Sequence, residues 1–365
     1  MSFLSRRSVA AAAAVGVGIA TIAGLGTVPA SAHTASLGPV HLISDAYVAP
    51  LQFAVHGHSI YVADSAKSAL YKVGRSTPIA RGPAPSGSPE ASGDLAGVAA
   101  AGGAIAYTTT SANHKDTRLT ILRHGHKKVV SLSRFEKRYN PDKRNYYGLE
   151  NVRHVSAQCK AELTAGHVPL SYRGDYDSHP YAVASLGHGS WAVADAGAND
   201  ILKVNRWGHV SLMAVLPAQP LHVTSAMATA VGAPDCAGVT YRFEPVPTDV
   251  EVGPHGKLYV TTLPGGPESP ALGARGSVYR VGWGWTHRIA TGFVTATNLA
   301  IAPCGTIYVA QLAAGTIAEV RHGHGVTVAS LAGVAAVEWA HGHLYASTAP
   351  AVLGGSGPGT IVRFG

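Results

Sequence analysis

The chain has 365 residues, with 28 Lys and Arg against 20 Asp and Glu, so its formal net charge is +8 with histidine neutral. Hydrophobic residues make up 46% of the chain and charged residues only 13%, about half the charged share of an average soluble domain. This balance excludes a charge-rich disordered chain, which needs low hydrophobicity and high net charge. Glycine and proline are frequent, but they stay below the level that marks low-complexity sequence.

The first 32 residues have the pattern of a secretory signal peptide. Arg6-Arg7 precede the uncharged run Val9–Leu25, and Ala30-Ser31-Ala32 supplies the small residues of a cleavage site. We therefore expect cleavage after Ala32 and a secreted, extracellular mature chain, exported by the general or the twin-arginine route. A retained membrane anchor is the alternative, and no second apolar run is long enough to span a bilayer.

A short sequence motif recurs along the rest of the chain. It consists of a predicted strand with alternating apolar and polar residues, a glycine turn, and a second strand that usually carries an aromatic residue. Its clearest copy is Val246–Val260. Six copies begin, in chain order, at Ala49, Asp94, His179, Val246, Thr297 and Val334. A third short strand follows most copies, and a glycine turn and a fourth strand come after it, as in Gly208–Val215.

Repeated groups of four short antiparallel strands predict an all-β fold, a six-bladed β-propeller formed by residues 33–365 as one domain. The last copy has only three strands, and His41–Ser44 is a spare strand before the first copy. We expect this strand to pair with the last blade and close the ring, which removes a free sheet edge. An open solenoid of six hairpins is the alternative.

Two stretches fall outside the pattern, residues 133–177 and 217–245, and we expect them as long loop insertions that cap one face. We call this the loop face: it carries the loops between repeats and those between second and third strands. The opposite side carries the turns between first and second strands and those between third and fourth strands, and we call it the turn face. The first insertion is basic and aromatic, which indicates either a platform for an anionic or aromatic ligand or a solvated loop.

The three cysteines differ in their predicted positions. Cys159 lies in the first insertion and Cys236 in the second, and both insertions flank the third repeat on the loop face. Cys304 lies in a tight turn on the turn face, too far away for a bond that needs Cα atoms within about 7 Å. Because export permits disulfides, we predict a Cys159–Cys236 bond and a free Cys304.

Several segments resemble the ScyD/ScyE family of secreted, NHL-like β-propellers. They are Phe135–Asp142, Asp177–Tyr181, Asp195–Leu202, Val246–Gly256 and Gly292–Ala300. The resemblance implies a secreted propeller of unknown activity. The chain departs from the family pattern at His179, Thr262 and Asn298, so a ligand held at those positions in relatives would be held differently here.

The candidate ligand-binding residues lie near the starts of the first strands, at the mouth of the ring on the loop face. They are His179, Tyr181, Asp249 and Asn298. Asp64, Asp195 and Asn199 also follow strands, but such residues more often satisfy the backbone of their own turns. The sequence contains no nucleophile elbow, no H-E-x-x-H and no P-loop.

These observations favour a non-catalytic extracellular binding or organising protein, a monomer without a cofactor, whose partner is a small molecule or an anionic cell-envelope polymer. Nucleic acid is not expected, since no binding module occurs. The alternatives are enzymes: a gluconolactonase-like hydrolase with Ca²⁺ or a similar ion held by oxygen ligands, or a quinone-dependent sugar dehydrogenase with His179 as the candidate catalytic histidine.

Histidine is unusually frequent, at 19 residues, and eleven of these lie at turns of the turn face. Six lie between the first and second strands of a repeat: His56, His58, His188, His255, His341 and His343. Five lie between the third and fourth strands: His124, His126, His209, His322 and His324. They are either ordinary turn residues or a surface that gains positive charge in acid and binds anionic polymers.

Overall fold

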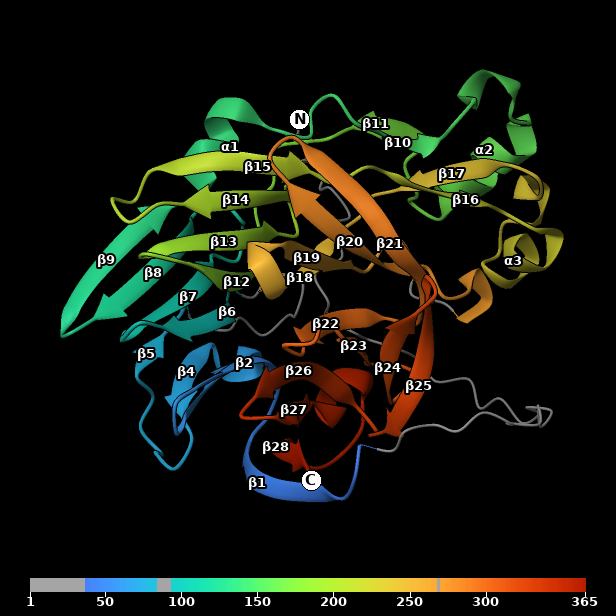
Figure 1. Ribbon diagram of the computed structural model, residues 1–365. Helices are drawn as coiled ribbons and strands as arrows, with labels where there is room; N and C mark the ends of the chain where they lie inside the picture. Colours follow the sequence, from blue (N-terminus) through green and yellow to red (C-terminus); the bar gives the residue numbers. More distant parts are fainter. Residues whose placement is uncertain (1–36, 84–92, 268–269) are drawn as a thin grey trace.

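The computed structural model describes residues 37–83, 93–267 and 270–365. The expected signal peptide, residues 1–32, and its cleavage site lie outside the described residues. Within those three ranges, no helix is long and apolar enough to cross a membrane. The fold is all-β and consists of four-stranded antiparallel sheets, which is consistent with a β-propeller (Figure 1).

Five sheets in the described ranges use four strands that follow one another along the chain. The first two sheets are β2 (Pro50–His56), β3 (Ser59–Asp64), β4 (Ala69–Lys72), β5 (Ala80–Arg81), and β6 (Asp94–Ala101), β7 (Ala104–Thr110), β8 (Thr117–Arg123), β9 (His126–Ser131). The third is β12 (Pro180–Gly187), β13 (Ser190–Asp195), β14 (Asp200–Val204), β15 (Val210–Val215). The fourth and fifth are β18 (Pro247–Val252), β19 (Leu258–Thr262), β20 (Gly276–Gly282), β21 (Trp285–Phe293), and β22 (Ala296–Ile301), β23 (Ile307–Gln311), β24 (Thr316–Arg321), β25 (His324–Ser330).

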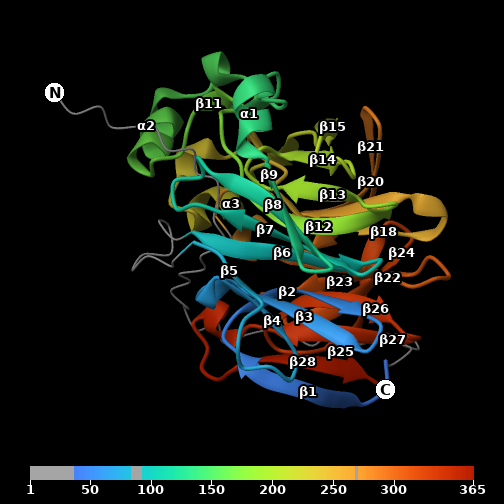
Figure 2. The same cartoon turned by 90° about the vertical axis from the view of Figure 1, so that its left-hand side faces the viewer.

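The sixth sheet combines both ends of the described chain. It holds β26 (Val334–Ala340), β27 (His343–Thr348) and β28 (Gly359–Phe364), and its outer strand is β1 (Val40–Tyr47). The register places Val40 opposite Phe364 and Leu42 opposite Val362. The first strands of the six sheets also contact one another in order: β2 lies against β6 and β26, β12 against β6 and β18, and β22 against β18 and β26. Figure 2 shows β12, β6 and β2 stacked side by side.

Tight turns explain the recurring His-Gly pairs. His188 has a φ of 50° and Gly189 a φ of 74°, and His341 and Gly342 show the same pattern, with 52° and 79°. Two successive positive φ angles are typical of a two-residue hairpin turn whose twist matches that of the strands. Histidine tolerates the first position and glycine suits the second, so these pairs fix the hairpins while leaving the imidazoles at the surface.

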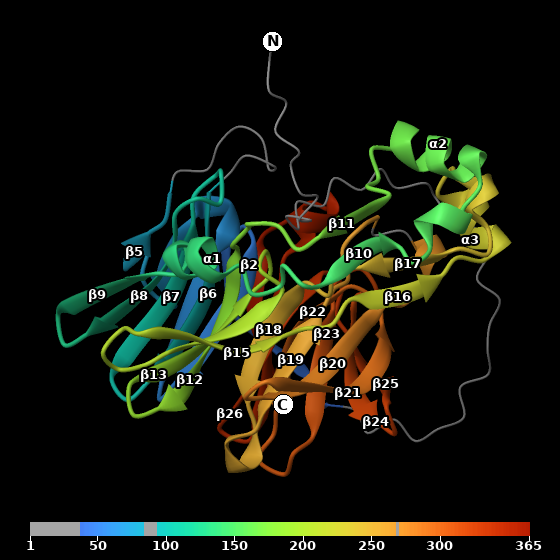
Figure 3. The same ribbon diagram turned by 90° about the horizontal axis from the view of Figure 1, so that it is seen from above.

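The two insertions are more ordered than the long loops expected from the sequence. Their strands form a further sheet in the order β11 (Ser171–Arg173), β10 (Tyr146–Leu149), β17 (Thr240–Phe243), β16 (Gln219–His222). Neither insertion contributes enough strands for a stable sheet by itself, and pairing β10 with β17 satisfies their backbones together. Figure 3 shows this sheet on the loop-face side, at the top of the view, with α2 and α3 beyond the edge of the ring.

Short helices complete the structure. The α-helices of the described ranges are α1 (Ser133–Tyr139), α2 (Ala157–Ala165) and α3 (Ser225–Ala230), all within the insertions. Single 3-10 turns occur at Ser65–Lys67, Val152–His154, Pro234–Cys236, Pro254–Gly256, Pro270–Leu272 and Pro350–Leu353. Ser156 and Thr224 cap α2 and α3 by accepting hydrogen bonds from backbone N–H groups of the first turn.

A disulfide joins Cys159 of the first insertion to Cys236 of the second, with Cα atoms 4.7 Å apart, and this is the pairing that the sequence indicates. Both cysteines are buried with Ala233. Cys304 is a free, exposed thiol. The bond therefore connects the two halves of the insertion sheet near its helices.

Replacing both Cys159 and Cys236 with serine should destabilise the insertion sheet far more than the ring. The bond spans 77 residues, and closing a loop of that length contributes about 4 kcal/mol in the chain-entropy model. Hydrogen exchange should show faster opening of β10 and β17, with β12 to β14 little changed. Cys304→Ser is the matched control, and equal protection of β10 and β17 in the double variant would contradict the prediction.

Candidate functional site

His179 lies at the boundary between the second and third sheets. Its Nε2 is 2.8 Å from Oδ2 of Asp94, the first residue of β6, and its side chain is 10% exposed. Its backbone N–H donates to Oδ1 of Asp195 at 2.6 Å. Both ring and backbone of His179 are therefore held in place immediately before β12 begins.

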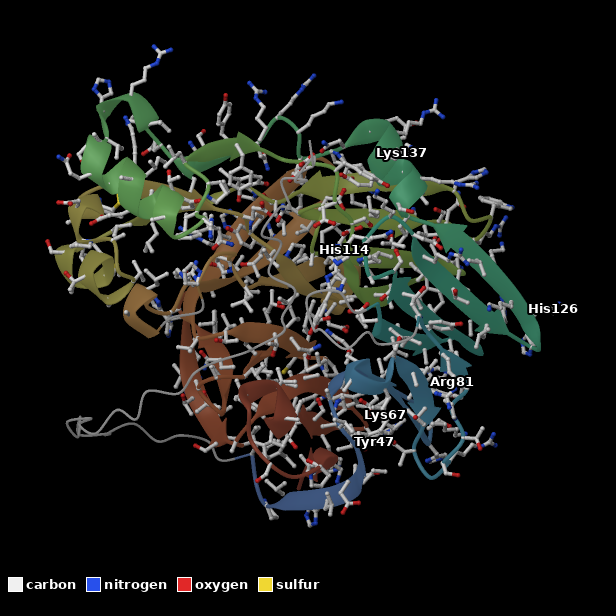
Figure 4. The ribbon with its side chains drawn as sticks, turned by 180° about the vertical axis from the view of Figure 1, so that it is seen from behind. Tyr47, Lys67, Arg81, His114, His126 and Lys137 are labelled. Atoms are coloured by element: carbon white, nitrogen blue, oxygen red, sulfur yellow. A yellow bond between two sulfur atoms is a disulfide. The ribbon has the colours of Figure 1, made fainter. Side chains whose placement is uncertain are left out.

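A second histidine, His114, lies beside it. His114 belongs to the turn between β7 and β8, and its Nδ1 is 2.7 Å from Oδ1 of Asp177. The ring centroids of His114 and His179 are 5.0 Å apart. Figure 4, which looks onto the loop face, places His114 near the middle of that face. The sequence analysis did not identify His114 as a candidate. Its turn joins the second and third strands of a repeat, and such turns were expected on the loop face.

The carboxylates keep His179 charged. Burial lowers its pKa, but the charge and hydrogen bond of Asp94, with Asp177 and Asp195 further away, outweigh burial and raise the pKa to about 9. His179 therefore carries a proton at neutral pH. The other carboxylate oxygen of Asp94, Oδ1, is buried and has no hydrogen-bond partner among the described residues.

Tyr181 connects this histidine pair to the mouth of the ring. Its ring meets the His179 ring edge-on, with centroids 5.9 Å apart. Tyr181 is buried in an apolar cluster to which first strands of several sheets contribute, including Leu51, Ala96 and Ala335. The mouth is thus packed with apolar side chains, and the polar groups of His114 and His179 lie beside this packing.

Asp249 and Asn298 hold the first strands together. Oδ2 of Asp249 accepts a hydrogen bond from the backbone N–H of Leu299 at 2.9 Å. Asn298 accepts one from the backbone N–H of Val337 at 2.7 Å and donates its amide to Oε1 of Gln52 at 2.9 Å. The structure therefore brings His179 and Tyr181 together, but it uses Asp249 and Asn298 to link sheets. The ligand-binding role of all four residues stays a prediction.

Three carboxyl groups on the first strands of the fourth and sixth sheets interact with one another. Burial raises the pKa of Asp249 to about 7. Burial also raises the pKa values of Glu251 and Glu338, and mutual repulsion among the three groups raises them further. Burial and mutual repulsion therefore favour the uncharged form of all three carboxyls, and no basic side chain is among the causes of these pKa shifts.

A larger group of buried acids lies between the third sheet and the insertions. Burial raises the pKa of Glu136 to about 9 and that of Asp142 to about 7, with repulsion from neighbouring carboxylates adding to both. The pKa of Asp200 is raised well above its ordinary value by burial and by the same neighbours. Asn199 donates to both Asp142 and Glu244 at 3.1 Å. Among described residues, no group of three or more His, Cys, Asp or Glu side chains is arranged to hold a metal ion.

Asp64, Asp195 and Asn199 satisfy backbone groups, as expected, but only Asp195 bonds within its own turn, to the N–H of Ala198. Asp64 accepts hydrogen bonds from the backbone N–H groups of Val48 and Ala49, both at 3.0 Å. Asp195 accepts from Ala198 N–H as well as from His179 N–H, and Oδ1 of Asn199 accepts from Val246 N–H. These side chains hold the segments that lead into first strands.

The basic and aromatic residues of the first insertion border a surface pocket of about 470 Å³. Tyr146, Arg153 and His154 line it together with Arg242 of β17. The guanidinium of Arg173 lies 4.7 Å from the Tyr146 ring centroid, so part of this aromatic surface is already covered by a cation. Glu150 also lines the pocket and lies 3.7 Å from the guanidinium of Arg242, so part of the positive charge is compensated.

Comparison with known proteins gives similarity in structure only. No protein-family model matches the chain, and no curated protein matches its sequence. The PQQ-bound aldose sugar dehydrogenase of Streptomyces coelicolor is similar with a TM-score of 0.55 and 13% identity, covering 89% of this chain and 97% of that one. A putative gluconolactonase gives 0.45 and 11% over 89% and 91% of the two chains. A calcium-binding regucalcin of Agrobacterium tumefaciens gives 0.40 and 15% over 70% and 67%. At these identities the first likeness establishes the propeller fold and nothing finer.

Stability should fall as pH rises through the neutral range. Between the ordinary Glu pKa of 4.5 and its folded value of about 9, Glu136 keeps its proton in the folded state and loses it on unfolding. The folded state then binds one more proton, so the free energy of unfolding decreases by about 1.4 kcal/mol per pH unit. Asp142 up to about 7, and His179 between 6.5 and about 9, act in the same direction.

Urea unfolding at several pH values checks this, with Glu136→Gln expected to have a shallower decline than the unchanged chain. Asp116→Asn is the control, because Asp116 is half exposed and pairs with Arg118. Identical slopes in the Glu136→Gln variant and the unchanged chain would show that Glu136 does not hold this proton.

Proposed function

We propose that the chain is a propeller hydrolase that uses acid–base chemistry on an ester or lactone at the loop face. The observation that carries the proposal is the pair His114 and His179, each bonded to its own carboxylate, with ring centroids 5.0 Å apart. Two imidazoles at this spacing can reach the two oxygens that must gain and lose protons in hydrolysis.

The two histidines have different roles in this proposal. His179, which carries a proton at neutral pH, donates it to the leaving alkoxide oxygen as the acyl carbon–oxygen bond breaks. His114, oriented by Asp177, takes a proton from the water whose oxygen bonds to the acyl carbon. The products are a carboxylic acid and an alcohol. Proton exchange with solvent then restores both histidines.

The similarity to an aldose sugar dehydrogenase supports an enzyme that acts on a sugar-like, hydroxylated molecule. We therefore propose a sugar lactone as the substrate class. A neutral substrate also fits the surroundings of the histidines, because Asp94 and Asp177 lie beside them and would repel an anion.

The residues near the mouth do not fit the quinone named for that dehydrogenase. PQQ carries several carboxylates and needs cationic partners. Around His179 the charged neighbours are Asp94, Asp177 and Asp195, and the mouth itself is apolar. A divalent metal fits no better, since the carboxylates of the described part of the chain do not form a coordinating group. No step is therefore assigned to either.

Three further points belong to the proposal. We take the six sheets whose first strands contact in a cycle as the six blades of one ring.

We also propose kinship with the ScyD/ScyE family, carried by segments such as Asp177–Tyr181, and an extracellular location. The Cys159–Cys236 bond is compatible with an oxidising compartment.

A non-catalytic binding role is the second candidate, and one observation favours it. The His179–Asp94 and His114–Asp177 pairs connect the second sheet to the residues that lead into the third, so they can serve as structural links alone. In that case their loss would reduce stability without removing any activity.

The test is hydrolysis of a panel of sugar lactones by the full chain and by His114→Gln and His179→Gln variants. Loss of an acid or base should lower kcat by about 100-fold or more, with KM little changed. His188→Asn, at a hairpin turn of the third sheet, is the control and should retain full activity. The proposal fails if the unchanged chain hydrolyses no lactone, or if folded His114→Gln and His179→Gln variants keep their kcat.

A further inference from the structure

A second pocket of about 380 Å³ lies where the ring closes, between the first and sixth sheets. Its cationic lining residues are His41 of β1, His58 in the turn after β2, His341 in the turn after β26, and Arg363 of β28. The ionisable nitrogens of this lining belong to three histidines and one arginine, and no carboxylate side chain lines it.

The cationic groups are brought together by the closure of the ring. His41 stands directly opposite Arg363 in the pairing of β1 with β28. His58 and His341 come from turns of different sheets, and their rings lie nearly parallel with centroids 6.3 Å apart. Nε of Arg363 is buried and has no hydrogen-bond partner among the described residues. No carboxylate of the pocket lining compensates the charge of this guanidinium.

One carboxylate lies on a strand next to this lining. Glu338 of β26 stands opposite Tyr345, which separates it from Arg363 along the row of paired residues. His58 and His341 have no carboxylate partner in the described ranges, so each is available to a ligand.

The remaining lining is apolar. Leu42 is 62% exposed and Ile43 37%, an unusual exposure for such side chains, and Val55, Ile60 and Tyr345 lie next to them. The pocket therefore combines an apolar surface with several cationic donors. A small inorganic anion would contact the donors but leave the apolar side chains without a partner.

We propose that this pocket binds a small organic anion, with a carboxylate, sulfonate or phosphate head and an apolar body. The head accepts hydrogen bonds from His58 and His341 and is attracted by the charge of Arg363, and the body packs on Leu42, Val55 and Ile60. A histidine that donates a hydrogen bond to an anion holds it more tightly when the imidazole is protonated. Binding should therefore strengthen in acid, and it is independent of the hydrolase proposed for the loop face.

The experiment is calorimetric titration of the full chain with 2-naphthoate at about pH 5.5 and about pH 7.5, the range in which histidine titrates. We expect Kd to be about tenfold lower at the acidic pH, the effect of one added charge-assisted contact. 2-Naphthol tests the need for the charge, and inorganic sulfate tests the need for the apolar body. Both should bind at least tenfold more weakly than 2-naphthoate at the acidic pH.

The His58→Asn, His341→Asn double variant should weaken 2-naphthoate binding about tenfold at the acidic pH and remove most of its pH dependence. Asparagine tolerates the positive φ of residue 341, so the hairpin is kept. His188→Asn is the matched control, since His188 has the same turn conformation in the third sheet and lies outside the pocket. Equal weakening by His188→Asn, unchanged binding in the double variant, or 2-naphthol binding as tightly as 2-naphthoate would overturn the proposal.

Discussion

The pairing of β1 with β28 is the interaction that connects the two ends of the described chain in one sheet. It completes the sixth sheet with a strand from the opposite end of the described chain and covers an edge that would otherwise expose unpaired N–H and C=O groups. The same pairing sets His41 opposite Arg363. The pocket on the turn face is therefore a consequence of how β1 completes the sixth sheet, and its residues come from both ends of the described chain.

The strands and hairpins could be predicted because each repeat has the same pattern of alternating residues and His-Gly or similar turns. The insertion sheet could not, since β10 and β11 have only four and three residues and alternation over so few positions carries no signal. The candidate site was predicted in part. His179 and Tyr181 do lie together, whereas His114 sits in a turn whose length differs from repeat to repeat.

Asp249 and Asn298 show why polar residue types at strand starts were ambiguous. Both side chains bond to backbone N–H groups of the next sheet, Leu299 and Val337. Asp64 and Asp195 do the same for the segments that precede first strands. A short acidic or amide side chain satisfies a strand start as well as it would bind a ligand, so only its neighbours distinguish the two roles. His179 differs because its ring bonds to a carboxylate and lies beside a second imidazole.

Histidine serves two opposite purposes in this fold, and the difference lies in its partners. Beside Asp94, the His179 ring keeps its proton through the neutral range, which suits a group that must donate one. On the turn face, His58 and His341 meet each other rather than a carboxylate. In the proposed pocket the negative charge comes with the ligand, whereas on the loop face it is built into the protein as Asp94. The same side chain is therefore fixed by its partner on one face and left to bind on the other.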